Sequence, residues 1–335
     1  MAKAVKLEDI AKRIGVSNVT VSKALADKEG VSAELRSKIK ELAQELGYKV
    51  KKSDQSIESG VKGDIGIVIP ARFVDKNSSF YWDMYERLIS WLTHYGFYGI
   101  LEILQSSDEE ELEQPRLVKD GKVQGLIVMG QVNRDYMEMI YGSELPVIFL
   151  DAYNSYTGCD AIISDGYYGM YTMTNYLLEK GHRDICFVGT PGSTSSISDR
   201  YFGYMRAMME KGIEVTTNMI VPDRDMGSGV IRIYLPDKIP SAFACNCDST
   251  AYELILALKE KGYRIPEDVS VVGFDNFMVS EISVPKITTY EVDVNGMAKV
   301  CAERLIKKIN NRSNKLGLKI IVGKIIVRDS VKDVN

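Results

Sequence analysis

The first 25 residues constrain this chain more than any other segment. The apolar residues that recur there at helical spacing are Leu7, Ile10, Ala11 and Ile14. They predict a short helix over residues 7–14 with one apolar face. Gly15 can adopt the positive φ that ends a helix, and the Ser17 hydroxyl can cap the next one. The pattern therefore predicts two short helices joined by a tight turn.

The second helix has a different character on each side. Val21, Ala24 and Leu25 turn inward in this pattern, and the outward side chains are Asn18, Val19, Ser22 and Lys23. A third helix follows Ser32, which is a plausible N-cap. Its apolar stripe consists of Leu35, Ile39, Leu42, Ala43 and Leu46, and Gly47 ends it. Three such helices make a small domain of the helix-turn-helix kind.

The outward side chains of the second helix are suited to reading DNA bases. They offer an amide, a methyl-bearing side chain, a hydroxyl and a cation. Residues 1–52 hold 12 Lys+Arg and 7 Asp+Glu, a charge of +5, whereas the whole chain carries −4. A basic segment on an acidic remainder is typical of a DNA-binding domain joined to a body that does not bind DNA. The alternative is a small helical interaction module.

Length and composition limit what the remainder can be. With 335 residues, 45% apolar and 26% charged, the chain fits two or three ordinary globular domains. No apolar run approaches the roughly 20 residues of a membrane span, and no signal-peptide core precedes the first helix, so we expect a cytoplasmic protein without a membrane partner. The five cysteines lack metal-ligand spacing, so no metal or cofactor is expected. We interpret Cys245-x-Cys247 as one strand with small buried or cleft-lining side chains, rather than as part of a metal site.

The remainder alternates between apolar strands and helices. Residues 50–63 are polar and predict a linker. The predicted strands span residues 65–69, 125–129, 147–150, 161–164, 185–188, 242–245 and 269–274. The predicted helices span residues 80–95, 136–141, 167–180, 200–211 and 250–261. This alternation predicts an α/β core of doubly wound parallel sheets covered on both faces.

In such sheets, ligands bind beyond the carboxyl ends of the strands. The residues found there are polar or aromatic; they include Ser79, Phe80, Tyr81, Asp151, Asp165, Asp199, Arg200, Asn246, Cys247, Asp248 and Asp275. Carboxylates and arginine bind hydroxyls, and rings pack on apolar sugar or base faces, so the set is typical of a site for a polyhydroxylated ligand. Strand-end aspartates also cap helices. We favour that role for Asp165, and ligand contact for Arg200 and Asp275.

Several motifs in order along the chain carry a family resemblance. They include Leu7-Glu8-Asp9-Ile10-Ala11, Val16-Ser17-x-x-Thr20-Val21-Ser22, Phe149-Leu150-Asp151, Gly181-His182-Arg183, Arg200-x-x-Gly203-Tyr204, Val271-Val272-Gly273-Phe274-Asp275 and Arg328-x-Ser330. Together they cover essentially the full length. The chain resembles the LacI/GalR family of transcriptional regulators.

The resemblance implies a homodimeric repressor of palindromic operator DNA. It implies a helix-turn-helix domain over residues 1–49, a hinge over 50–63 and an effector-binding core over 64–335. The core would resemble a periplasmic sugar-binding protein, with one lobe of about 64–163 plus 292–322 and another of about 164–291 plus 323–335. A small carbohydrate-like effector would bind between the lobes and change operator affinity.

The resemblance also implies roles for particular residues. Asn18, Val19 and Lys23 stand where family members contact bases, and Ser17, Thr20 and Ser22 are better suited to phosphates. Ser32 is a further DNA-contact candidate, and Ile57 stands where a hinge leucine enters the minor groove. The positions that match effector contacts are Phe80, Tyr81, Asp151, Arg200, Cys247 and Asp275.

Three departures from the family pattern stand out. In the hinge, Asp54 replaces the usual alanine and lowers helix propensity, which argues against minor-groove kinking. Near residue 224 the usual stacking aromatic is absent and Arg224 stands in its place. An effector that carries an anionic group or exceeds a monosaccharide in size would explain this, and a surface arginine in a trimmed loop is the equal alternative. Cys247 replaces a polar side chain and removes a hydrogen-bonding site.

Two other classes of function compete for the core. An enzyme would need a catalytic motif, and the chain has no Walker loop, no G-x-G-x-x-G after the first strand and no G-x-S-x-G elbow. His182 is better interpreted as structural. A transport-type solute-binding protein would lack the basic helical segment at the N-terminus. Turnover of the ligand would distinguish an enzyme from a binding protein.

Overall fold

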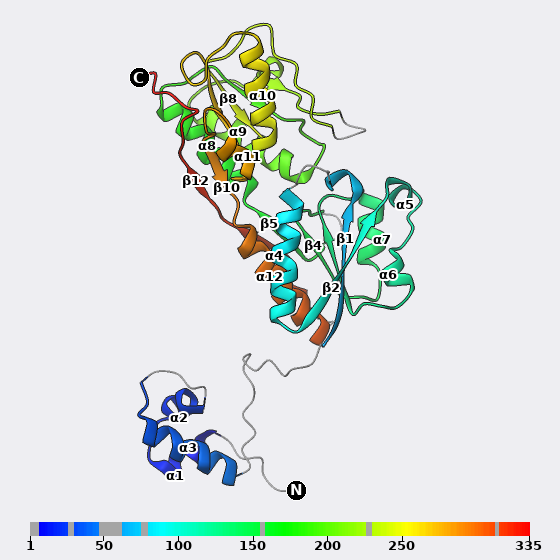
Figure 1. Ribbon diagram of the computed structural model, residues 1–335, viewed down its shortest axis with the longest axis vertical. Helices are drawn as coiled ribbons and strands as arrows, with labels where there is room; N and C mark the ends of the chain where they lie inside the picture. Colours follow the sequence, from blue (N-terminus) through cyan, green and yellow to red (C-terminus); the bar gives the residue numbers. More distant parts are fainter. Residues whose placement is uncertain are drawn as a thin grey trace. The chain divides into compact units, whose positions relative to one another are not determined.

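A computed structural model describes residues 7–25, 30–46, 62–74, 80–154, 158–225, 230–311 and 315–335. It divides into two compact units, residues 1–59 and residues 60–335 (Figure 1). We refer to the first unit as the head and to the second as the core. Residues 50–61 of the predicted hinge, which include Asp54 and Ile57, lie outside the described residues, as does Ser79.

The head contains three helices, α1 (Leu7–Ile14), α2 (Asn18–Leu25) and α3 (Ala33–Glu45). Its small core is built from apolar side chains of all three. The buried members are Ile10, Ala11, Val21, Ala24, Ile39 and Ala43. Gly15 has a φ of +79°, the left-handed conformation that ends α1. The bounds of α1 and the inward positions of α2 confirm the sequence prediction.

The first lobe of the core is a six-stranded sheet in the order β11-β5-β4-β3-β1-β2. All of its pairings are parallel. Its strands are β1 (Gly63–Pro70), β2 (Phe97–Leu104), β3 (Gly125–Met129), β4 (Val147–Leu150), β5 (Ala161–Ser164) and β11 (Leu318–Ile321). Its helices are α4 (Phe80–His94), α5 (Ser106–Glu110), α6 (Arg116–Lys119), α7 (Arg134–Tyr141) and α12 (Val294–Asn310), and a 3-10 turn, η1, spans Ala71–Phe73.

Helices cover both faces of this sheet. Ile65, Ile67 and Ile69 of β1 pack in one cluster with α4 and α12, whereas Val68 packs with α7 in another. Alternate side chains of one strand thus enter opposite layers, as the pleat requires. Figure 1 shows α4 and α12 on one side of the sheet and α5, α6 and α7 on the other.

The second lobe is a parallel four-stranded sheet in the order β7-β6-β8-β9. Its strands are β6 (Ile185–Val188), β7 (Ile220–Val221), β8 (Ala242–Cys245) and β9 (Ser270–Val272). Its helices are α8 (Gly166–Glu179), α9 (Ser195–Glu210), α10 (Asp248–Glu260) and α11 (Met278–Ile282), with a 3-10 turn, η2, at Thr217–Met219. Together the two lobes confirm the predicted α/β class.

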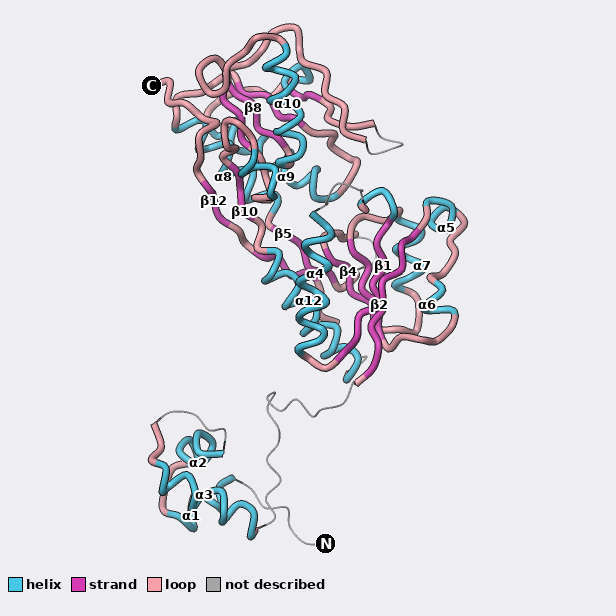
Figure 2. The backbone as a smooth tube through the Cα atoms, in the orientation of Figure 1, coloured by secondary structure: helices cyan, strands magenta, loops and turns pink. Residues whose placement is uncertain are grey.

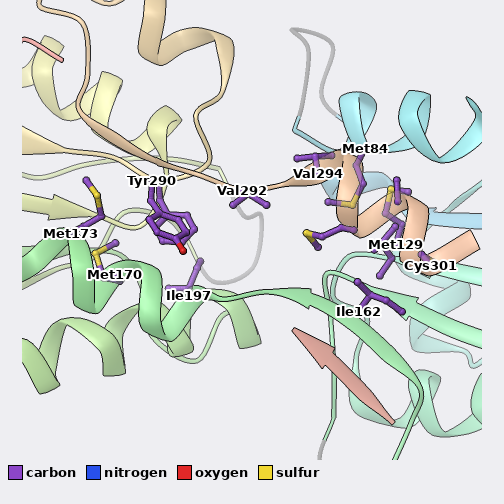
Figure 3. Packing of buried hydrophobic residues seen from close by; sticks show 14 of the residues in the cluster. Met84, Met129, Ile162, Met170, Met173, Ile197, Tyr290, Val292, Val294 and Cys301 are labelled. Carbon is purple, nitrogen blue, oxygen red and sulfur yellow. The ribbon is translucent and has the colours of Figure 1, made fainter. Parts of the chain in front are cut away.

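The chain passes between the lobes three times, after β5, after β10 (Thr289–Glu291) and before β12 (Lys324–Ile326). β10 and β12 form an antiparallel pair (Figure 2). The largest apolar cluster continues across these crossings. Figure 3 follows it from Met170 and Tyr290 through Val292 to Met84 and Met129. The two sheets therefore share a continuous buried core at the crossings.

Three sequence predictions need correction. Strand β2 was not predicted, because it is an edge strand whose side chains are mostly half-buried and it contains Gly99 and Glu102. Helix α9 begins at Ser195, five residues before the predicted start, because Thr194 caps it by accepting from the N–H of Ile197. Cys245 and Cys247 do not share a strand: β8 ends at Cys245, and Cys247 is the N-cap of α10.

Among the described residues, no helix combines the length and apolar character needed to cross a membrane, and no group of three potential ligand side chains is placed to hold a metal ion.

Candidate functional site

The outward face of α2 is the candidate nucleic-acid interface. The Ser17 hydroxyl accepts a hydrogen bond from the N–H of Thr20 at 3.1 Å and lies 2.9 Å from the Thr20 hydroxyl. This cap fixes where α2 starts, and the burial of Val21 and Ala24 fixes its rotation. Asn18, Val19, Ser22 and Lys23 are consequently exposed, as predicted. This face thus presents the mixture of groups that base edges require.

The serine and threonine candidates have structural roles as well. Ser17 and Thr20 are engaged with each other in the cap of α2. The Ser32 hydroxyl accepts from the N–H of Leu35 at 3.4 Å, at the start of α3. Ser22 is exposed on α2. A capping hydroxyl still has lone pairs and a proton to offer a phosphate, so both roles are compatible.

In the core, the first lobe contributes an aromatic–carboxylate pair. Tyr81, in the first turn of α4, donates its hydroxyl to Asp151 at 2.9 Å. Asp151 follows β4, has a φ of +62° and is buried. Burial raises the pKa of Asp151, and the charge of Arg200 opposes the rise. Burial and the neighbouring Asp151 raise the pKa of Tyr81 well above its ordinary value. The pair holds a carboxylate in a poorly solvated position.

The second lobe contributes a buried ion pair. Arg200 of α9 donates to Asp275, which follows β9, at 3.0 Å, and also to the carbonyl of Asn246 at 2.6 Å. Its guanidinium lies 4.0 Å from the ring centroid of Phe274. Its Nε is buried without a hydrogen-bond partner among the described residues. Burial raises the pKa of Asp275 to about 6, against the opposing charge of Arg200.

These two groups face each other across the lobes. Asp151 and Tyr81 both interact electrostatically with Arg200, and Asp275 interacts with Asp151. The structure therefore brings together four predicted residues from two lobes. Phe80 adjoins them, because its ring contacts that of Tyr81 edge to face at a centroid distance of 5.6 Å.

Arg224 belongs to another polar cluster, which lies within the second lobe. Its Nη2 donates to Asp223 at 2.6 Å, and Asp223 is fully buried. Asp223 also accepts from the side chains of Thr190, Asn246 and Thr250. Burial alone would raise the pKa of Asp223, but the bonds from Arg224, Asn246 and Thr250 outweigh it, and the pKa is lowered.

This cluster corrects one expectation about Arg224. Its side chain is only 16% exposed, so it is not a surface arginine. Because Asp223 already balances its charge, the guanidinium gives no support to an anionic effector. Cys247 lies beside it: burial raises the pKa of the Cys247 thiol, and the charge of Arg224 opposes the rise. Of the described cysteines, Cys247 is the one of intermediate exposure, and the other four are buried.

Asp248 has a different position from the other candidates. It is completely buried, and its carboxylate accepts from the Thr289 hydroxyl at 2.6 Å and from the N–H of Phe277 at 2.8 Å. It therefore ties α10 to the segments after β9. Its carboxylate is occupied by these bonds, and it also interacts electrostatically with Asp275. Asp165 caps α8 by accepting from the N–H of Tyr168, as predicted. His182 is buried between Ser241 and the carbonyl of Lys332.

Three side chains near the site were missed. Phe73 packs on Tyr81 at a centroid distance of 4.9 Å, and Gln131 and Tyr153 bond to the second lobe. Gln131 comes two residues after β3 and Tyr153 three residues after β4. Ligand sites in such sheets lie beyond the carboxyl ends of the strands, so both residues are found when the three residues after every strand are considered.

Comparison with known proteins gives the class. Residues 6–50 match the model of the bacterial regulatory proteins of the lacI family, and residues 174–331 match a periplasmic binding protein-like domain. The chain is 30% identical to the HTH-type transcriptional regulator RegA of Clostridium saccharobutylicum, over 92% of this chain and 94% of RegA. It is 25% identical to the HTH-type transcriptional repressor PurR of Pasteurella multocida, over 97% and 98%.

Solved structures agree in fold. The lac repressor dimer bound to operator and the anti-inducer ONPF superposes with a TM-score of 0.68 at 22% identity, covering 98% of this chain and all of that chain. A CelR–cellobiose complex gives a TM-score of 0.69 at 21% identity, covering 97% and 99%. The chain belongs to the LacI family of transcriptional regulators. Its relatives are regulators rather than enzymes, which sets the enzyme alternative aside.

Proposed function

We propose that this regulator is a repressor that binds a palindromic operator as a homodimer, and that a small carbohydrate-like effector bound between its lobes changes operator affinity. The observation that carries the effector site is the buried group formed by Tyr81 and Asp151 of one lobe with Arg200 and Asp275 of the other. Burying charged side chains costs free energy, and clusters of buried charged groups with perturbed pKa values are frequent at functional sites.

The chemistry of this group favours a neutral polyhydroxylated ligand. The two carboxylates can accept hydrogen bonds from hydroxyl groups, the unpartnered Nε of Arg200 can donate one, and the rings of Phe80 and Tyr81 offer apolar faces. The formal charges of Asp151, Arg200 and Asp275 sum to a negative value, which disfavours an anion. A neutral sugar therefore suits this site better than a sugar phosphate does.

For DNA, we propose that Asn18, Val19 and Lys23 contact bases and that Ser17, Thr20, Ser22 and Ser32 contact phosphates. The exposure of the α2 side chains supports this assignment. Phosphate contacts position the head without specifying sequence, whereas the base contacts discriminate. Ile57 remains a hinge candidate from the sequence alone.

For dimerisation, exposed apolar side chains around α11 support a second copy as partner. Met278, Ile282 and Val284 are all more than half exposed, which is unusual for side chains so close in sequence. A charged substitution at Ile282 should shift the protein towards monomer in sedimentation, while the matched surface substitution at Met209 of α9 should not.

The test of the operator proposal is selection of genomic DNA fragments by the purified protein at about physiological salt, where non-specific phosphate binding is weak. Enrichment of one imperfect palindrome is the expected result. For the effector, the protein's thermal unfolding is measured against a panel of neutral sugars, sugar phosphates and nucleobases. A neutral sugar should raise Tm in the wild type and not in Arg200→Ala; a rise with phosphorylated sugars alone contradicts the proposal.

A further inference from the structure

Among the described residues, two residue pairs are joined by side-chain hydrogen bonds directly from the first lobe to the second, and both end on the first turns of α9. Ser195 donates its hydroxyl to the Gln131 Oε1 at 3.0 Å, and its N–H points to the same oxygen at 3.4 Å. Tyr153 donates its hydroxyl to the Asp199 Oδ1 at 2.9 Å. Gln131 and Tyr153 come from the segments after β3 and β4, so the first lobe holds α9 at two points.

The first-lobe partner Gln131 is itself fixed. Its carbonyl accepts from the Arg72 Nη2 at 2.5 Å. Arg72 in turn forms an ion pair with Glu109 at 2.6 Å, and the Glu109 side chain is only 6% exposed. Such a half-buried, charge-assisted pair holds its members in one geometry better than an exposed pair does. The backbone of Gln131 is thus braced from the outer side of the first lobe.

The held segment of α9 also carries Arg200. Asp199, which accepts from Tyr153, is the residue immediately before it. On its other side Arg200 is fixed by Asp275 and the carbonyl of Asn246, both in the second lobe. The start of α9 is therefore bonded to the first lobe as well as to its own, and a movement that separates the first lobe from α9 breaks the bonds of Gln131 and Tyr153.

We propose that Gln131 and Tyr153 form an interlobe clasp, made of the pairs Gln131–Ser195 and Tyr153–Asp199, that positions the first turns of α9 and, through them, Arg200. Both are positioning residues in this scheme, since neither needs to touch an effector. The clasp itself does not depend on the proposed effector site, but its role in regulation does. An effector whose binding requires α9 to shift must first break the clasp.

The experiment measures amide hydrogen exchange by mass spectrometry in the full-length protein, without ligand or DNA. Gln131→Ala and Tyr153→Phe each remove one clasp bond from the first lobe. Because an intramolecular hydrogen bond contributes about 0.5–1.5 kcal/mol, each should speed exchange in the segment 194–200 of the second lobe by about two- to tenfold, and the double variant by more.

The control is Tyr171→Phe. Tyr171 donates to Glu210 at 2.7 Å, so it also bonds a tyrosine hydroxyl to a carboxylate of α9, but both residues lie within the second lobe. It should leave exchange at 194–200 unchanged. Conversely, Ser195→Ala in the second lobe should speed exchange at 130–134 in the first, and adding Gln131→Ala to it should have little further effect there.

The proposal is overturned if effects stay within the lobe that carries the substitution, or if Tyr171→Phe acts like Tyr153→Phe. Because exchange is measured without effector, these outcomes are independent of whether a sugar binds at Arg200. If the exchange changes appear but no sugar raises Tm, the clasp proposal stands and the effector proposal fails. If a sugar raises Tm but the exchange changes are absent, the effector proposal stands and the clasp proposal fails.

Discussion

The outward face of α2 and the interlobe group around Arg200 use similar residue types in opposite surroundings. Asn18, Ser22 and Lys23 are exposed on the helix that carries them. The side chains of Arg200 and Asp275 are only 6% and 10% exposed, they bond to each other, and Arg200 also bonds to the carbonyl of Asn246. A face that must meet a large surface has to project outward, whereas a site that must enclose a small molecule has to be organised before the molecule arrives.

The comparison teaches where substitution should cost stability and where it should cost only binding. Removing an exposed polar side chain leaves the fold intact, because water replaces its contacts. Removing one partner of a buried pair leaves the other charge without compensation.

The largest effect is expected for Arg200→Ala. It leaves Asp275 buried next to Asp151 without its cation, and breaking such a pair typically costs about 3–5 kcal/mol. Urea denaturation monitored by circular dichroism measures the loss. The matched control is Arg206→Ala on the same helix, where both members of the Arg206–Glu210 pair are well exposed. It should cost far less, because an exposed ion pair contributes little to stability; equal losses would show that burial of Arg200 is not what matters.

The second prediction concerns the head. Asn18→Ala and Lys23→Ala should each weaken binding to the selected operator by about 1–3 kcal/mol, because each removes a proposed contact to a base edge. Neither should change Tm, since both side chains are exposed. Fluorescence anisotropy at fixed salt measures the affinity. Lys38→Ala, at an exposed position of α3, is the control. An equal loss there would indicate a general charge effect rather than base contact.

A smaller effect is expected from pH. Burial raises the pKa of Asp275 from 3.8 to about 6. The folded state therefore binds a proton that the unfolded state releases, so the contribution of Asp275 to stability falls as pH rises through 6. Relative to Asp275→Asn, the wild type should be less stable at pH 7.5 than at pH 5.5.

Asp268 provides the control of opposite sign. Its bonds with Arg264 lower its pKa to about 2. The stability it contributes is present above its unfolded pKa and is lost only as pH falls through 2, so Asp268→Asn should show no such trend between pH 5.5 and 7.5. A flat profile for Asp275 as well would mean that the buried carboxylate stays ionised throughout.

Sequence reasoning succeeded where local pattern decides the structure. The apolar spacing and the Gly15 turn determine α1 and α2, and uninterrupted apolar runs mark β3, β4, β5 and β6 at their observed bounds. The strand-end rule led to Asp151, Arg200 and Asp275, because the carboxyl ends of parallel strands meet at one edge. These features depend on a few neighbouring residues.

It failed where partners distant in sequence decide. Asp223, which pairs with Arg224, is held by bonds from Thr190, Asn246 and Thr250, and the contacts of Thr289 and Phe277 occupy Asp248. Neither arrangement can be inferred from spacing, because these partners come from segments that are far apart in the sequence. Strand β2 was missed for a related reason: at an edge, pairing with β1 stabilises a strand whose own pattern is weak.

The smallest expected effect returns to the interlobe region, at Cys247. Its sulfur caps α10 by accepting from the N–H of Thr250 at 3.4 Å, a long contact to a weak acceptor. Serine is a preferred N-cap, so Cys247→Ser should stabilise the protein by about 0.5–1 kcal/mol. Cys301→Ser is the contrasting variant: Cys301 is fully buried among apolar side chains of α12 and its surroundings, and a hydroxyl placed there should destabilise by about 1–3 kcal/mol. Destabilisation by both variants would contradict the prediction. It would show that the contacts of the Cys247 thiol beside Arg224 contribute more to stability than a better N-cap would add.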